Sequence, residues 1–187
     1  MKKLIALLMA LMLCLPALAE TTPAEDAPEA AELLSPFAIA LPEEVTELTT
    51  PGGSSVTYVH ANGTTRAVAQ VLSRVPDPEG DHAAELLRLM ALFAPDSEDV
   101  TPLAMADGFH GLMALAPDAQ NGMKGARVDQ VTVMVLWQTA ERGELLILSA
   151  YDLGDVTDNA WALLNLLTRS VSVEGVPVVE PVAEPGQ

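Results

Sequence analysis

The chain has 187 residues and a formal net charge of −17 at pH 7; half of its residues are hydrophobic and it contains one cysteine. Phosphate backbones and anionic membrane surfaces repel so acidic a protein, which argues against nucleic-acid binding. The length and apolar content suit one packed domain.

Residues 1–19 have the pattern of a secretory leader. Lys2 and Lys3 precede an apolar run of 12 residues, Leu4–Leu15, and Ala17-Leu18-Ala19 supplies a small-x-small exit. The run is shorter than the roughly 20 residues that cross a bilayer as a helix. We therefore expect a secreted, extracytoplasmic protein that is cleaved after Ala19 and is not inserted in the membrane afterwards.

Cys14 raises the alternative of a lipoprotein. Lipid attachment needs a small residue immediately before the cysteine, and Leu13 is bulky, so ordinary cleavage is favoured. The processed chain would have 168 residues and a net charge of −19, because Lys2 and Lys3 leave with the leader. It would form no disulfide although export permits them, so a packed core must stabilise it.

Composition divides the rest of the chain into three parts. Residues 20–35 are rich in Pro, Ala and acids and lack aromatic residues, which predicts a flexible acidic linker. Residues 36–175 carry the periodic patterns of a folded domain. Residues 176–187 are again Pro- and Glu-rich, and we expect a loose tail.

The first half of the domain predicts three strands. Residues 37–41 alternate and stop at Pro42, and residues 55–60 alternate next. Asn62-Gly63 is a strong hairpin signal, typical of a type I′ turn with two positive φ angles. The chain then returns over residues 64–72, so these last two strands should pair antiparallel.

A helix and further strands follow. Asp81 is a good N-cap for a helix that runs to about Phe93 with an apolar stripe at helical spacing. Residues 99–103 and 109–116 predict strands, and residues 120–125 a loop.

The last third of the domain predicts a hairpin and a helix. Residues 130–138 and 144–151 form two strands, and 145–150 is apolar on both faces. A strand of this kind needs cover on both sides of its sheet. Thr157 should cap a final amphipathic helix, and residues 170–173 add a short strand. The fold class is therefore α+β, with a largely antiparallel central sheet and helices packed on it.

This pattern resembles the PsbP-like fold, named for an extrinsic subunit of photosystem II and shared with a Ran-binding nuclear import factor and with exported bacterial proteins. The matching features are residues 37–42 at the domain start, the Asn62-Gly63 hairpin, the helix that ends at Phe93-Ala-Pro95, the paired strands 130–138 and 144–151, and the closing helix 160–169. The resemblance covers about residues 36–174. It implies an α/β/α sandwich and a role in binding or assembly, and it transfers no site residues.

The three histidines, His60, His82 and His110, are far apart in the sequence and belong to no metal-binding spacing. We expect each to be a surface or packed side chain. No Gly-x-Ser-x-Gly motif occurs, and the Gly-rich segment 51–55 precedes a strand instead of a helix, so it predicts a turn.

Three acids recur before the last helix. Asp152, Asp155 and Asp158 lack the alternating spacing, glycine and distal Glu of a calcium loop. The simpler interpretation is that they favour the positive end of the helix, and a weak cation site stays open as the alternative. Trp137 and Trp161 are placed to pack in the core; if exposed, they would become binding candidates.

The sequence assigns no catalytic, cofactor or metal residues. The leading hypothesis is an exported, non-enzymatic module that binds a protein or a small ligand. One alternative is a hydrolase of an uncommon type, with a deep pocket and converging acids or histidines. The other is a structural component associated with the cell envelope.

Overall fold

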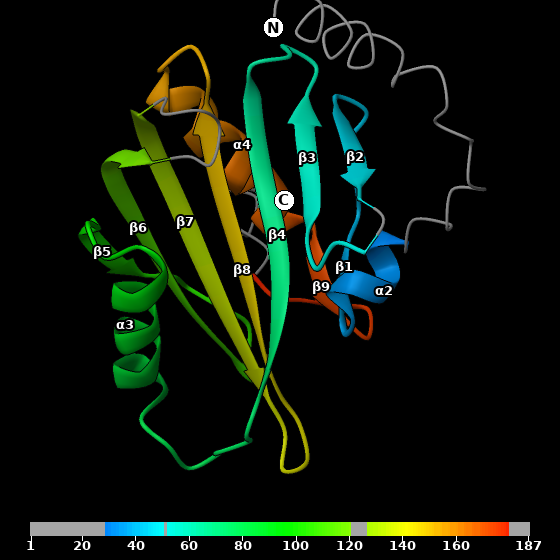
Figure 1. Cartoon of the computed structure of the whole chain (residues 1–187). Helices are drawn as coiled ribbons and strands as arrows, with labels where there is room; N and C mark the ends of the chain where they lie inside the picture. The colour runs from blue at the N-terminus through cyan, green and yellow to red at the C-terminus, as the bar shows by residue number, and fades with distance from the viewer. Residues whose placement is uncertain (1–28, 51, 121–126, 180–187) are drawn as a thin grey trace, which may run out of the picture.

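The computed structural model describes residues 29–50, 52–120 and 127–179 (Figure 1). The expected leader, most of the linker and the end of the tail lie outside these residues, as does most of the predicted loop 120–125. Within the described part, none of the helices combines the length and the apolarity needed to cross a membrane.

The main sheet is antiparallel throughout, with the strand order β2-β3-β4-β8-β7-β6-β5. Its strands are β2 (Val45–Thr49), β3 (Val56–His60), β4 (Thr65–Arg74), β5 (Glu98–Pro102), β6 (Phe109–Gln120), β7 (Arg127–Gln138) and β8 (Gly143–Asp152). After β4 the chain crosses to the far edge and returns through a meander, so β8 pairs with β4 in the middle. The predicted α+β class is confirmed.

Two helices cover opposite faces of this sheet (Figure 1). α4 (Thr157–Arg169) packs on the face that contains Leu146 and Leu148 of β8. α3 (His82–Phe93) packs on the face that contains Leu145 and Ile147. Consecutive β8 residues are therefore buried on both sides of the sheet, as the apolar run predicts.

A second, smaller sheet joins the two ends of the folded body. β1 (Phe37–Ile39) pairs with β9 (Val171–Val173), which also pairs with β10 (Val176–Pro177). The first predicted strand thus exists but belongs to this small sheet, beside α4 and not within the main sheet (Figure 1).

The folded body extends beyond both predicted boundaries. α2 (Ala30–Leu34) lies inside the expected linker 20–35, and Ala30 and Leu34 are buried against the core. The expected tail 176–187 begins with β10, and Val178 is fully buried. Average composition missed these segments, because in each a few apolar side chains at the right spacing dock among many acids and prolines.

Two local predictions on turns and caps were wrong in detail. The Asn62-Gly63 hairpin is present, but only Gly63, with φ of 77°, has a positive φ, so the turn is not type I′. The side chain of Asn62 instead accepts hydrogen bonds from the backbone N–H groups of Thr64 and Thr65. Asp81 caps α3 as predicted, whereas Thr157 does not cap α4: its hydroxyl donates to Asp129, 2.6 Å away.

Candidate functional site

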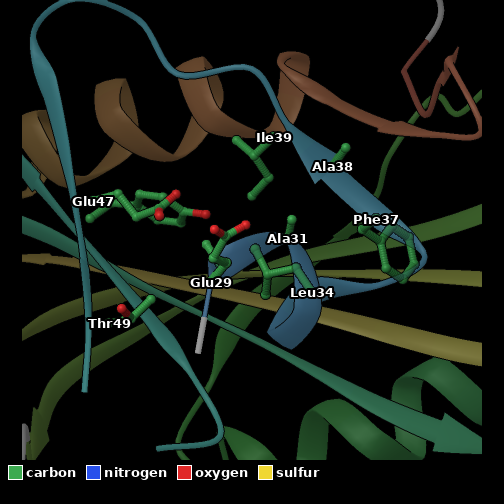
Figure 2. Close-up of a pocket in the computed structure, with 10 residues that line it drawn as sticks. Glu29, Ala31, Leu34, Phe37, Ala38, Ile39, Glu47 and Thr49 are labelled. Carbon is green, nitrogen blue, oxygen red and sulfur yellow. The ribbon is translucent and has the colours of Figure 1, made fainter. Parts of the chain in front are cut away.

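A half-open groove lies between α2, β1 and β2, with a volume of about 420 Å³ (Figure 2). It occupies the end of the molecule where the small sheet meets the edge of the main sheet. The lining residues are Glu29, Ala30, Ala31, Leu34, Phe37, Ala38, Ile39, Glu47, Thr49 and Tyr58.

One wall of the groove is apolar and is held by the core. Leu34 on α2 and Phe37 on β1 are buried, and Ile39 is half-buried against the same cluster. The short spacing between α2 and β1 places both on this wall. The wall is therefore fixed by packing and is ready to contact an apolar portion of a ligand.

The other side of the groove carries two carboxylates. Glu29 lies at the N-terminal end of α2 and Glu47 in the middle of β2, and both are exposed. Figure 2 shows their carboxylates pointing into the same space. Two negative charges that share one concave site favour a positively charged group there.

Tyr58 adds a polar group at the base of the groove. It lies directly opposite Glu47 in the β2–β3 pairing and has 0% exposure. Burial, and then the charge of Glu47, raise the pKa of Tyr58, so the phenol stays protonated. The phenol therefore contributes a neutral hydrogen-bonding group to the lining of the groove.

The structure brings two of the three histidines together. The rings of His82, at the start of α3, and His110, on β6, lie with their centroids 4.3 Å apart. Burial, followed by the charge of His82, lowers the pKa of His110. His60 lies elsewhere, beside a smaller hollow of about 280 Å³ that also contains Glu44 and Asn62.

Asp152 differs in role from Asp155, which precedes α4, and from Asp158, which lies in the first turn of α4. It is buried, and its carboxylate accepts hydrogen bonds from Thr64, Thr65, Asn159 and the backbone N–H of Gly154. Asp155 and Asp158 are exposed. No group of three or more His, Cys, Asp or Glu side chains suited to a metal ion occurs within residues 29–50, 52–120 and 127–179.

The tryptophans and the Gly-rich segment have structural positions. Trp137 and Trp161 are both half-buried and pack against the core, and the guanidinium of Arg142 lies 5.8 Å from the Trp137 ring. Pro51 lies outside the described residues. Gly53 donates to the carbonyl of Thr50 in the turn between β2 and β3, as expected of this segment.

Sequence reasoning did not find the groove. β2 buries only Val45, so its sequence lacks the alternation that reveals a half-buried strand. Glu29 was counted with the linker. The signal available was the sequence Val45–Thr49 between a proline and a Gly-rich turn, which fits an edge strand.

No family model and no curated protein matches the chain. Among solved structures, the chain resembles LpqN of Mycobacterium tuberculosis, described as involved in cell envelope biogenesis. The two share 16% sequence identity with a TM-score of 0.50, over 73% of this chain and 82% of LpqN. At this identity the likeness concerns the fold alone, and membership of the PsbP-like family stays a prediction.

Proposed function

We propose that the protein is an exported, non-catalytic binding module of the bacterial cell envelope whose groove recognises a positively charged group. The observation that carries the proposal is the convergence of the Glu29 and Glu47 carboxylates on one groove (Figure 2), whose lining also includes the buried Tyr58. The apolar wall would hold the stem of the ligand and the carboxylates its cationic end.

Two further observations support the location in the envelope. Residues 1–19 have the pattern of a cleavable leader. LpqN, which has a similar fold, is described as involved in cell envelope biogenesis. Neither observation indicates the ligand, whose chemistry follows from the residues that line the groove.

The groove favours binding over hydrolysis. A carboxyl that acts as a general acid is usually held in apolar, buried surroundings, which keep it protonated at neutral pH. Glu29 and Glu47 are both exposed. Neither carboxyl therefore has the apolar surroundings that would distinguish a general acid from its partner base.

The test uses the processed chain, residues 20–187, and two small probes. The first is lysine blocked at both backbone ends, and the second is the same molecule with its side-chain amine acetylated. We expect the charged probe to shift the NMR signals of groove residues and the neutral probe to shift none. Glu29→Gln or Glu47→Gln should each weaken binding by roughly fivefold, because one ion pair is lost.

The matched control is Glu98→Gln, which removes an exposed acid of β5 at the opposite edge of the sheet. This change should leave the affinity unaltered. The proposal fails if both probes bind equally, if neither binds, or if the Glu98 variant weakens binding as much as the groove variants.

A further inference from the structure

We propose that the natural occupant of the groove is an extended peptide segment with a basic side chain, which adds to β2 as an antiparallel eighth strand. This inference rests on the proposed recognition of a positive charge and names the class of molecule that carries it. Three independent observations support it: an open strand edge, the position of the acids along that edge, and the arrangement of side chains on either face of β2.

β2 is the last strand at its side of the main sheet. The carbonyl of Glu44 accepts a hydrogen bond from the N–H of Ala61 across the β2–β3 ladder. In an antiparallel ladder, backbone groups point to the same side at every second residue. Thr46 and Leu48 therefore face β3, whereas Glu47 and Thr49 direct their N–H and C=O groups toward the open edge.

Glu47 and Thr49, whose N–H and C=O groups both point to the open edge, are the two β2 residues that line the groove. Among the described residues, no ladder or turn hydrogen bond satisfies these groups. Two donors and two acceptors in an extended row are the template for an added strand. The groove therefore offers backbone recognition beside its charge recognition.

The register of the added strand follows from the side chains. A residue placed directly opposite Glu47 in an antiparallel pair has its side chain on the same face as Glu47 and Tyr58. The carboxylates of Glu29 and Glu47 both lie on that face, so the peptide residue opposite Glu47 is basic. Its two neighbours point to the other face, where Leu48 is 53% exposed, so apolar neighbours fit there.

The same charges disfavour a second copy of the chain as the occupant. Antiparallel pairing of two β2 strands about Glu47 would place like charges directly opposite each other, which is destabilising. A cationic strand turns this repulsion into attraction. The open edge is thereby protected from pairing with itself while it stays available to a basic partner.

The experiment uses a blocked five-residue peptide with a central lysine between two valines and a threonine at each end. Titration into the processed chain, followed by NMR and calorimetry, should give tighter binding than the blocked lysine alone. The amide protons of Glu47 and Thr49 should become protected from exchange with solvent in the complex, because they then donate to the peptide.

N-methylation of the peptide supplies the matched control. A methyl on the lysine backbone nitrogen removes the N–H that faces Glu47 and should reduce affinity at least tenfold. A methyl on the nitrogen of the following valine modifies an N–H that points away from β2, and should change the affinity less than twofold. The two peptides have the same charge, mass and side chains.

The variant Thr49→Pro tests the protein side. Proline removes the Thr49 N–H from the open edge, keeps both carboxylates, and spares the β2–β3 ladder, where edge strands tolerate it. We expect it to weaken binding of the five-residue peptide severalfold, and by a larger factor than it weakens binding of the blocked lysine. Thermal unfolding of the variant verifies that it folds, and the methylated peptides test the inference on the unaltered chain in any case.

The outcomes separate the inference from the proposed function. If the blocked lysine binds but the two methylated peptides bind equally well, charge recognition stands and strand addition is wrong. If the valine methylation is the damaging one, the antiparallel register is wrong. If the chain dimerises and the peptide does not compete, a second copy is the occupant. If neither the lysine nor the peptide binds, both proposals fail.

Discussion

Asp152 shows what one buried carboxylate does for this fold. It has 2% exposure and accepts four hydrogen bonds, from Thr64, Thr65, Asn159 and the Gly154 backbone. Burial alone would raise the pKa of Asp152, but these hydrogen bonds outweigh it and hold the pKa below its usual value. Through these hydrogen bonds, the Asp152 carboxylate connects the β3–β4 hairpin to the start of α4.

Replacement of Asp152 by alanine should destabilise the protein by about 2–4 kcal/mol, because several donors lose a charged acceptor inside the protein. Urea unfolding measures this loss. Asp158→Ala removes an exposed acid from the first turn of α4 and should cost less than about 1 kcal/mol. Equal losses in the two variants would mean that Asp152 acts only on the helix end, as the sequence pattern suggested.

The same residue predicts a pH dependence. Because the pKa of Asp152 is lower in the folded state, its contribution to stability is present above the unfolded pKa near 3.8 and is lost as the pH falls through the folded value. The difference in unfolding free energy between the natural chain and Asp152→Asn should therefore be at its full value above about pH 5 and shrink as the pH falls below about 4. A difference that stays constant would contradict this account.

His110 offers a second titration. Burial, and then the neighbouring His82, lower the pKa of His110, because two adjacent rings disfavour a second positive charge. In NMR titrations, His82→Ala should raise the pKa of His110 part of the way toward 6.5. His60→Ala, which alters a distant histidine, should leave it unchanged.

At the scale of elements, β8 carries the two-sided core. Leu148 and Ile147 are neighbours in sequence but pack on opposite faces, toward α4 and α3 respectively. Replacement of either by alanine should cost about 2–4 kcal/mol in urea unfolding, through lost burial and the cavity left behind. Leu92→Ala on the outer face of α3, where the leucine is 66% exposed, should cost less than about 0.5 kcal/mol.

Prediction from sequence succeeded where burial is periodic. The strands 130–138 and 144–151 and both long helices were found, because each buries a full stripe or both faces of its sequence. β2 and α2 were missed because each places only one or two side chains in the core. The groove forms between these weakly patterned segments, so its residues could not be brought together before the fold was known.

The role of Asp152 was missed for a related reason. Its partners Thr64 and Thr65 lie almost ninety positions earlier in the chain, and no spacing rule connects them. The sequence around Asp152 indicated an interaction with α4, the helix that follows. Thr64 and Thr65 instead lie where β4 begins, in the β3–β4 hairpin. Asp152 on β8 lies directly opposite Thr65 on β4, so the pairing of these two strands brings the carboxylate and its partners together.

At the scale of the whole molecule, the predicted leader and the single cysteine give a prediction about export. Expression of the full chain in a bacterium should release a product that begins at Glu20 and contains no cysteine. Mass spectrometry of the exported protein measures both features. A product that begins at Cys14 and carries lipid would support the lipoprotein alternative.

The pairing of β1 with β9, with Phe37 opposite Val173, places the beginning and the end of the folded body side by side. These two ends can therefore be joined, and the chain opened elsewhere, without changing how the strands and helices are arranged in space. A flexible linker of about ten residues between positions 179 and 29, with new ends opened at Asn62-Gly63, should yield a circular permutant with the same fold. In that permutant the new linker would replace residues 1–28 and 180–187, so the groove could be studied without them.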